Sequence, residues 1–204
     1  MTSELIVGMT TAVLTSIIGP IAVHYVKLLT EKKKKEDPLG ESMKVNELII
    51  TKMESIRLDA HADRVWLLQF HNGGHFYPTG KSIQKFSMVY EVLSNSAIPC
   101  QHQFQNIPVS LFSKAINVLH KGKVICIDDT TIADKQYEGF TSVIPGSGVK
   151  STYMFPVYNI KDHFIGIVGA DFSSKKKALD MAQLTDVEIE ISTIGGVLDN
   201  YLTY

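Results

Sequence analysis

The longest apolar segment of the chain lies at its N-terminus. Between Leu5 and Val26 the sequence contains no Asp, Glu, Lys or Arg, and this length matches the roughly 20 residues that a helix needs to cross a bilayer. Pro20 within the segment predicts a kink, which membrane helices tolerate. Residues 1–30 are therefore predicted to form a single transmembrane anchor that contacts membrane lipid through residues 5–26.

Charges around this segment predict its orientation. Glu4 precedes it, whereas Lys27 and the run Lys32–Lys35 follow it, and positive residues favour the cytoplasmic side. We therefore expect a single-pass protein of the inner (cytoplasmic) membrane, with the N-terminus outside and the remaining chain in the cytoplasm. A cleaved secretory signal would need a basic segment before the apolar run and a small-residue cleavage site after it. A buried core helix would not usually be apolar on all sides and be followed by lysines.

Apolar periodicity divides the rest of the chain into a basic juxtamembrane linker at residues 31–43 and one domain at residues 44–204. Pro38 and Gly40 are expected to interrupt helical structure in the linker. Three- and four-residue spacing predicts helices in the domain, and runs of β-branched and aromatic residues predict strands. The predicted helices are 41–62, 111–120 and 184–201; the predicted strands are 65–70, 87–93, 124–127, 152–158 and 164–172; a turn at 71–74 and a loop at 130–148 connect them.

The last predicted helix has an apolar stripe with two possible uses. Its spacing of alternating three and four residues suits either the face that packs on a sheet or a coiled-coil pairing face, and the first helix has a similar stripe. Both uses remain open from the pattern. If the stripes are pairing faces, the chain is predicted to form a homodimer through the first and last helices of the domain. The stripe of the last helix consists of Leu184, Val187, Ile191, Ile194, Leu198 and Tyr201.

Composition narrows the classes of function. The 204 residues include 20 Lys and Arg against 21 Asp and Glu, so the chain lacks the basic field on which nucleic-acid binding depends. Cys100 and Cys126 are too few for a disulfide framework or a zinc site. The sequence therefore predicts neither nucleic acid as a partner nor a metal or other cofactor.

The order of elements, together with one hairpin, resembles the GAF domain, a cytoplasmic sensor fold related to PAS. The most specific part is Gly148–Tyr158 followed by Phe164–Phe172, where Pro156 and the Ile165-Gly166 pair stand where GAF domains carry a proline and an Ile-Gly. This resemblance implies an α/β (α+β) fold with a central antiparallel sheet flanked by N- and C-terminal helices, here preceded by a transmembrane helix. Gly166 and Gly169 would let a helix or a ligand approach the sheet.

Several ligands of GAF domains are not implied by this resemblance. The Asn-Lys-Phe-Asp-Glu signature of cyclic-nucleotide-binding members is absent from the sequence. Members that attach a bilin have a Cys followed by His, whereas Cys100 is followed by Gln101 and then His102, and Cys126 falls within a predicted strand. The free-methionine-sulfoxide reductase branch uses several pocket cysteines, and two scattered ones do not reproduce that set.

Candidate ligand-binding residues come from the polar turn and the aromatic positions. The segment His71, Asn72, Gly73, Gly74 and His75 could line the mouth of a pocket, because glycines let a ligand approach; a tight structural turn is the alternative. Two histidines four apart would suit a metal only on a helix, which the glycines oppose. Asp128 is a further candidate, although the Asp128-Asp129 pair could instead form a turn. Five aromatic residues could line the pocket or could instead fill the core: Tyr90, Phe104, Tyr137, Tyr153 and Phe155.

These observations favour a membrane-anchored cytoplasmic GAF-like sensory or regulatory module that binds a small molecule or a protein partner. A second hypothesis is a non-catalytic tethered scaffold, of a kind that a phage could encode, that recruits a cytoplasmic partner. A third is a small enzyme that uses His71 and Asp128. No nucleophile elbow or phosphate-binding loop is present, so the sequence predicts a protein that is not an enzyme.

Overall fold

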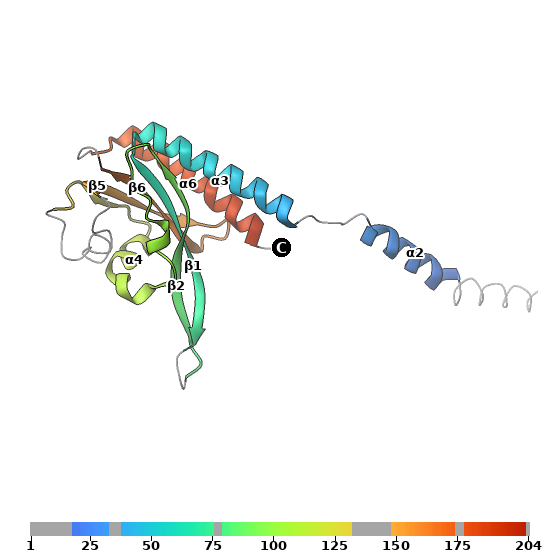
Figure 1. Cartoon of the computed structure of the whole chain (residues 1–204). Coiled ribbons are helices and arrows are strands. Elements are labelled where there is room, and N and C mark those ends of the chain that lie inside the picture. The colour runs from blue at the N-terminus through green and yellow to red at the C-terminus, as the bar shows by residue number, and fades with distance from the viewer. Residues whose placement is uncertain (1–17, 33–37, 76–78, 132–147, 174–177, 203–204) are drawn as a thin grey trace, which may run out of the picture. The chain divides into compact units, whose positions relative to one another are not determined.

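The computed structural model describes residues 18–32, 38–75, 79–131, 148–173 and 178–202 (Figure 1). Its contacts divide the chain into two units, Met1–Ser42 and Met43–Tyr204. The first unit contains helix α2 (Gly19–Lys32). Within the described ranges, no helix combines the length and the apolarity that crossing a bilayer requires. Residues 5–17, the greater part of the expected span, lie outside those ranges, so the anchor stays a prediction.

Helix α3 (Pro38–Ala60) begins earlier than expected. The predicted interruption is wrong at Gly40, which lies inside α3; at Pro38 the structure has the start of a helix, since α2 ends at Lys32 and α3 begins at the proline. Proline is well accommodated in the first turn of a helix, where its missing N–H would have had no intrahelical partner. Proline therefore marks the start of α3 rather than a break in it.

The second unit is built on a six-stranded sheet in the order β3-β2-β1-β6-β5-β4, and all its neighbouring strands are antiparallel. The central pair, β1 and β6, comes from opposite halves of the sequence. The hairpin predicted at residues 152–158 and 164–172 is confirmed as β5 and β6, and the strand predicted at 124–127 as β4. The strands are β1 (Arg64–His75), β2 (Ser82–Leu93), β3 (Ile107–Pro108), β4 (Ile125–Ile127), β5 (Ser151–Tyr158) and β6 (Phe164–Phe172).

Helices cover both faces of this sheet. Helices α3 and α6 (Met181–Leu202) lie side by side on one face, and α4 (Ser113–His120) lies on the other (Figure 1). Two short 3₁₀ helices, η2 (Gln101–Gln103) and η3 (Val109–Phe112), precede α4. Alternation along the strands sends successive side chains to opposite faces, so the sheet has a separate apolar core on each side.

The apolar stripe of the last helix packs on the sheet. Four of its residues are buried in the core beneath α3 and α6, together with the corresponding residues of α3. The stripe is therefore occupied by core packing within the protomer, and a pairing face would have to use other residues. The buried residues are Val187, Ile191, Ile194 and Leu198 on α6, and Ile49, Met53, Ile56 and Ala60 on α3.

The first hairpin is longer than predicted. The expected turn at residues 71–74 is wrong, because β1 continues through His75 and β2 begins at Ser82 rather than at 87. Pairing between β1 and β6 ends at Gln69, and β2 pairs with β3 only at Lys85 and Phe86. Beyond these pairs, β1 and β2 continue as a two-stranded ribbon (Figure 1). Gly73 suits the ribbon because a Cβ there would lie 2.4 Å from the side chain of Lys85. Most of the loop predicted at 130–148 lies outside the described residues.

Candidate functional site

The predicted residues of the polar segment lie on the ribbon. The Nε2 atom of His71 is 3.0 Å from the Ser87 hydroxyl, and the amide of Gln84 donates a hydrogen bond to Asn72 Oδ1 at 2.8 Å. His75 pairs with Ser82 at the end of the strand. These contacts hold the two strands together, as cross-strand pairs do.

The remaining predicted residues are divided between the two faces of the sheet. The hydroxyl of Tyr90 donates to Asn46 on α3, whereas Phe104 is buried in the core on the α4 side. Tyr153 faces the α6 side, donates to Asp128 and accepts a hydrogen bond from the Leu179 amide at 3.1 Å. Asp128 and Tyr153 are thus brought together, and the rest of the predicted set is not.

The Asp128–Tyr153 contact has an electrostatic consequence. Burial raises the pKa of the Tyr153 phenol, and its hydrogen bond to Asp128 raises it further. The phenol therefore stays protonated and donates to the carboxylate. The neighbouring Asp129 accepts hydrogen bonds from the backbone and hydroxyl of Thr131, which confirms the turn-forming interpretation for that residue.

The arrangement separates His71 from Asp128. His71 lies on β1 beyond the last residue pair between β1 and β6, and Asp128 follows β4, with β6 and β5 between these strands. Strands are spaced about 4.8 Å apart, so the two side chains stand on the order of 14 Å or more from each other. They cannot act on one bond of a small substrate.

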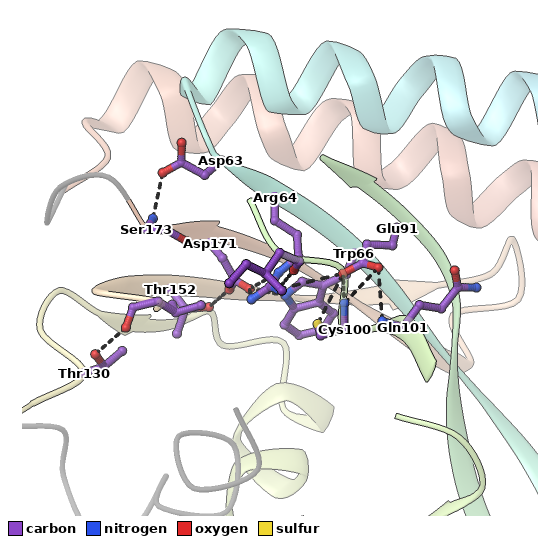
Figure 2. Close-up of polar contacts among 12 residues, drawn as sticks. Asp63, Arg64, Trp66, Glu91, Cys100, Gln101, Thr130, Thr152, Asp171 and Ser173 are labelled. Carbon is purple, nitrogen blue, oxygen red and sulfur yellow. Dashed lines mark hydrogen bonds and ion pairs between the residues drawn. The ribbon is translucent and has the colours of Figure 1, made fainter. Parts of the chain in front are cut away.

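A buried polar cluster lies on the α4 side of the sheet, at one end of β1 and β6 (Figure 2). Arg64 and Asp171 are directly paired across these strands, and their side chains are 1% and 0% exposed. Arg64 Nε donates to Asp171 Oδ2 at 2.8 Å, and Nη2 lies 2.7 Å from the same oxygen. Trp66 Nε1 donates to that oxygen at 3.0 Å, and the Thr152 hydroxyl donates to Oδ1 at 2.6 Å. Asp171 thus joins three strands.

Glu91 is the second carboxylate of the polar cluster. It stands opposite Trp66 on β2 and accepts hydrogen bonds from the backbone amides of Cys100 at 2.9 Å and Gln101 at 3.1 Å. Arg64 Nη1 lies 3.9 Å from Glu91 and donates to the carbonyl of Ile98 at 2.9 Å. The carboxylate and the guanidinium therefore fasten the segment after β2 to the sheet (Figure 2).

The charges of the polar cluster stabilise one another. Burial alone would lower the pKa of Arg64, but the carboxylates of Asp171 and Glu91 outweigh it and raise the pKa. Arg64 therefore stays charged. Burial also raises the pKa of the Cys100 thiol to about 12, with a further contribution from its hydrogen bond to Glu91. Because the thiolate is the reactive form of cysteine, Cys100 is a hydrogen-bond donor here and not an activated nucleophile.

Trp66 extends the polar cluster into the apolar core on the α4 side. A Cβ at Gly169, its partner on β6, would lie 2.0 Å from the indole ring. The close approach predicted at Gly169 is therefore made by Trp66 of the neighbouring strand, and not by a helix or a ligand. A Cβ at Gly166 would likewise lie too close to a neighbouring strand, 2.4 Å from the carbonyl oxygen of Leu68.

The residues of the polar cluster were not among those predicted from the sequence. One feature of the sequence indicates the cluster: a charged residue flanks each of two apolar strand segments. Arg64 precedes VWLL, and Asp171 follows IVGA. Such residues are almost never fully buried unless they are paired. A search for complementary charges at buried strand ends would have suggested the pair.

Comparison with known proteins identifies the type of fold. No family model matches the chain, and no curated protein matches it. Among solved structures, the blue-light-absorbing PixJ GAF domain of Thermosynechococcus elongatus aligns with a TM-score of 0.62 at 16% identity, over 79% of this chain and 89% of that one. The phycocyanobilin-bound GAF domain of a cyanobacterial phytochrome aligns with a TM-score of 0.59 at 17% identity, over 80% and 88%. The chain has a GAF-like fold: a curled antiparallel sheet with flanking helices.

Proposed function

We propose that this chain is a sensory or regulatory module that binds a small molecule. The supporting observation is its GAF-like fold, shared with domains described as bound to phycocyanobilin and to biliverdin. Those ligands belong to those proteins. In this chain the thiol of Cys100 is buried and hydrogen-bonded to Glu91, so we do not extend covalent bilin attachment to it.

The layered arrangement suggests how a bound molecule would produce a signal. Helices α3 and α6 lie together on one face of the sheet (Figure 1), and α6 packs closely on β5. A ligand can shift a conformational equilibrium only by its differential affinity for two states. We propose that the two states differ in the packing of these helices on the sheet.

Membrane attachment is part of the proposal. The apolar side chains Ile21, Val23 and Val26 of α2 are exposed, and lysines follow the helix, as they do at the cytoplasmic end of membrane helices. We propose that residues 5–26 insert in the inner membrane and hold the domain at its cytoplasmic face. Thiol labelling of intact cells tests this: Thr2→Cys should react with an impermeant reagent and Lys44→Cys should not, and the reverse pattern would contradict it.

We also propose that the protein forms a homodimer through its helices. Because the predicted apolar stripes are buried in the core, the contact would use other residues. Met43, Ile50 and Leu58 of α3 are exposed although they are apolar. They lie within roughly 80° of one another around the helix axis at 100° per residue. We propose that this side of α3 forms the homodimer contact.

The second candidate function is a non-catalytic scaffold at the membrane. The observation in its favour is the filled core on the α4 side of the sheet, where Trp66, Phe104 and Phe112 are buried by their neighbours. A ligand there would have to displace these side chains. In this alternative the domain would recruit a cytoplasmic protein and bind no small molecule.

Native mass spectrometry of the full chain, released from detergent, distinguishes the two candidates. The sensor proposal predicts a mass above that of the polypeptide which disappears on denaturation. The scaffold alternative predicts the bare polypeptide mass, together with no thermal shift from a metabolite library. That combined result would overturn the proposal of small-molecule binding.

A further inference from the structure

A cavity of about 430 Å³ opens at the edge of the sheet, between the end of α4 and helix α6. It forms because strand pairing stops there. Strand β4 pairs with β5 only from Thr152 to Met154, and the preceding chain, Gly122–Val124, diverges toward α4. In the described part of the sheet, residues 155–158 of β5 therefore have no neighbouring strand on this side.

The walls of the cavity are held in place without a ligand. The Tyr158 hydroxyl lies 3.1 Å from the carbonyl oxygens of Leu119 and His120 at the end of α4. In the β5–β6 turn, the amide of Asn159 donates to Asp199 on α6 at 2.9 Å. A preformed site of this kind loses little conformational entropy on binding, and its volume falls within the range of small-molecule pockets.

The lining combines apolar surface with negative charge. Phe155, Ile160 and Ile191 provide apolar surface, and Ile160 is 68% exposed at the rim. Asp162 and Glu188 add two carboxylates, and none of the lining residues is basic. Cations are favoured beside carboxylates and aromatic rings, whereas an anion would be repelled.

The backbone of β5 adds a hydrogen-bond acceptor. Alternation in an antiparallel ladder directs the carbonyl of Pro156 to the same side as that of Met154, which faces β4. Pro156 has no N–H to offer on this edge. The cavity wall therefore presents acceptors, which suit a ligand with N–H donors.

We propose that this cavity binds a small organic cation with an apolar group, such as an arylalkylamine. This inference rests on the proposed function and specifies its site, at the edge of the sheet against α6 and away from the filled core on the α4 side. Glu188 and Asp162 balance the ammonium charge, and Ile160 and Ile191 cover the apolar group. The bound cation contacts α6 directly through Glu188, Ile191 and Ser192.

Three related probes test the chemistry on the full chain in detergent. Phenethylamine, charged at pH 7.5, should bind saturably in calorimetry, 2-phenylethanol at least about tenfold more weakly, and phenylacetate not at all. Raising NaCl from about 0.05 to 0.5 M should weaken amine binding, because screening reduces the attraction between exposed charges. Equal binding of the amine and the alcohol, or no saturable binding of the amine, would overturn the inference.

Variants test the location. Glu188→Gln combined with Asp162→Asn should weaken amine binding about tenfold, whereas Asp186→Asn, an exposed acid on the same helix outside the cavity, should change it less than twofold. Unchanged tryptophan emission and melting temperature check that the variants are folded. Equal losses in the cavity variant and the Asp186→Asn control would contradict the site.

A cavity-filling variant separates this inference from the proposed function. Ser192→Trp should abolish phenethylamine binding and also remove any molecule that copurifies with the wild type. If the native mass spectrum of Ser192→Trp retains that molecule, the protein still binds a small molecule but the cavity is not its site. If the wild type does not bind phenethylamine, this inference fails. The proposed function fails only if the wild type also carries no molecule and no compound of the metabolite library raises its melting temperature.

Discussion

The indole ring of Trp66 occupies the space that a side chain at position 169 would fill. We therefore expect Gly169→Ala to displace the ring and break its hydrogen bond to Asp171. Overpacking of this kind costs about 1–3 kcal/mol in the free energy of unfolding. Trp66 is the only tryptophan of the chain, so urea unfolding and a red shift of tryptophan emission report both effects. Wild-type stability and emission in Gly169→Ala would contradict the packing described.

The second prediction concerns the buried ion pair. Asp171→Asn should destabilise the protein by about 3–5 kcal/mol, because it leaves the guanidinium of Arg64 buried beside a neutral group. Glu54→Gln is the control: Glu54 also pairs with an arginine, Arg57, but at the surface, where such pairs contribute at most about 1 kcal/mol. Equal losses in the two variants, measured by urea unfolding, would show that Asp171 is not essential to the core.

Cys100 gives a prediction about alkaline pH. Its pKa rises to about 12 in the folded chain from an ordinary value of 9.0, so its contribution to stability is complete below pH 9. As pH rises from 9 toward 12, the unfolded chain loses the thiol proton and the folded chain keeps it, which favours unfolding. Cys100→Ala should therefore lose less stability than the wild type between pH 8 and 10.5, measured by urea unfolding.

Thiol reactivity provides an independent check on Cys100. Cys126 is exposed and Cys100 is buried. At pH 8, a thiol reagent such as DTNB should label Cys126 at least about a hundredfold faster than Cys100, since a buried neutral thiol reacts only when the structure opens. The Cys126→Ser variant isolates the slow reaction. Fast labelling of that variant would contradict the burial of Cys100.

Two adjacent glycines on α6 offer a matched pair of substitutions. A Cβ at Gly195 would lie 2.1 Å from the carbonyl oxygen of Tyr158, whereas a Cβ at Gly196 meets nothing within 4 Å. Gly195→Ala should lower stability by about 1–3 kcal/mol, and Gly196→Ala should raise it by up to about 1 kcal/mol through helix propensity. Thermal unfolding of both variants tests whether α6 contacts β5 at this point.

The proposed dimer has its own test. Ile50 is exposed on α3, so Ile50→Glu should shift the protein from dimer to monomer in light scattering without lowering its melting temperature. Leu48→Glu is the control: Leu48 is also apolar and exposed on α3, but it lies about 160° around the helix axis from Ile50, so the substitution should leave the mass unchanged. A wild-type protein that is already monomeric at about 100 µM would refute the dimer.

Local patterns predicted the β5–β6 hairpin well because alternation, β-branched residues and a polar turn all indicated the same structure. They failed at residues 71–75, since glycine in a strand and glycine in a turn have the same sequence signal and only the pairing with β2 distinguishes them. The stripe on α6 was ambiguous for a related reason: a helix uses the same spacing to pack on a sheet and to pair with another helix.

The polar cluster was beyond local patterns for a different reason. Arg64 and Asp171 are 107 residues apart in the sequence, and neither strand contains information about which strand it will pair with. Once β1 and β6 are known to be neighbours, the register alone brings the two charges together. The cavity at α6 is similarly a product of pairing, because it lies beside the part of β5 that β4 does not reach, before β4 begins at Ile125.

The pairing of β1 with β6 also determines when the protein can fold during its synthesis. Ribosomes add about 5–20 residues per second, so α3 and β1 leave the ribosome on the order of ten seconds before β6 and α6. During this interval the apolar side of α3, with Ile49, Met53 and Ile56, has no sheet to pack against. The apolar side of α3 therefore gains its packing partners only when the last quarter of the chain has been translated, so the domain completes its core late in synthesis.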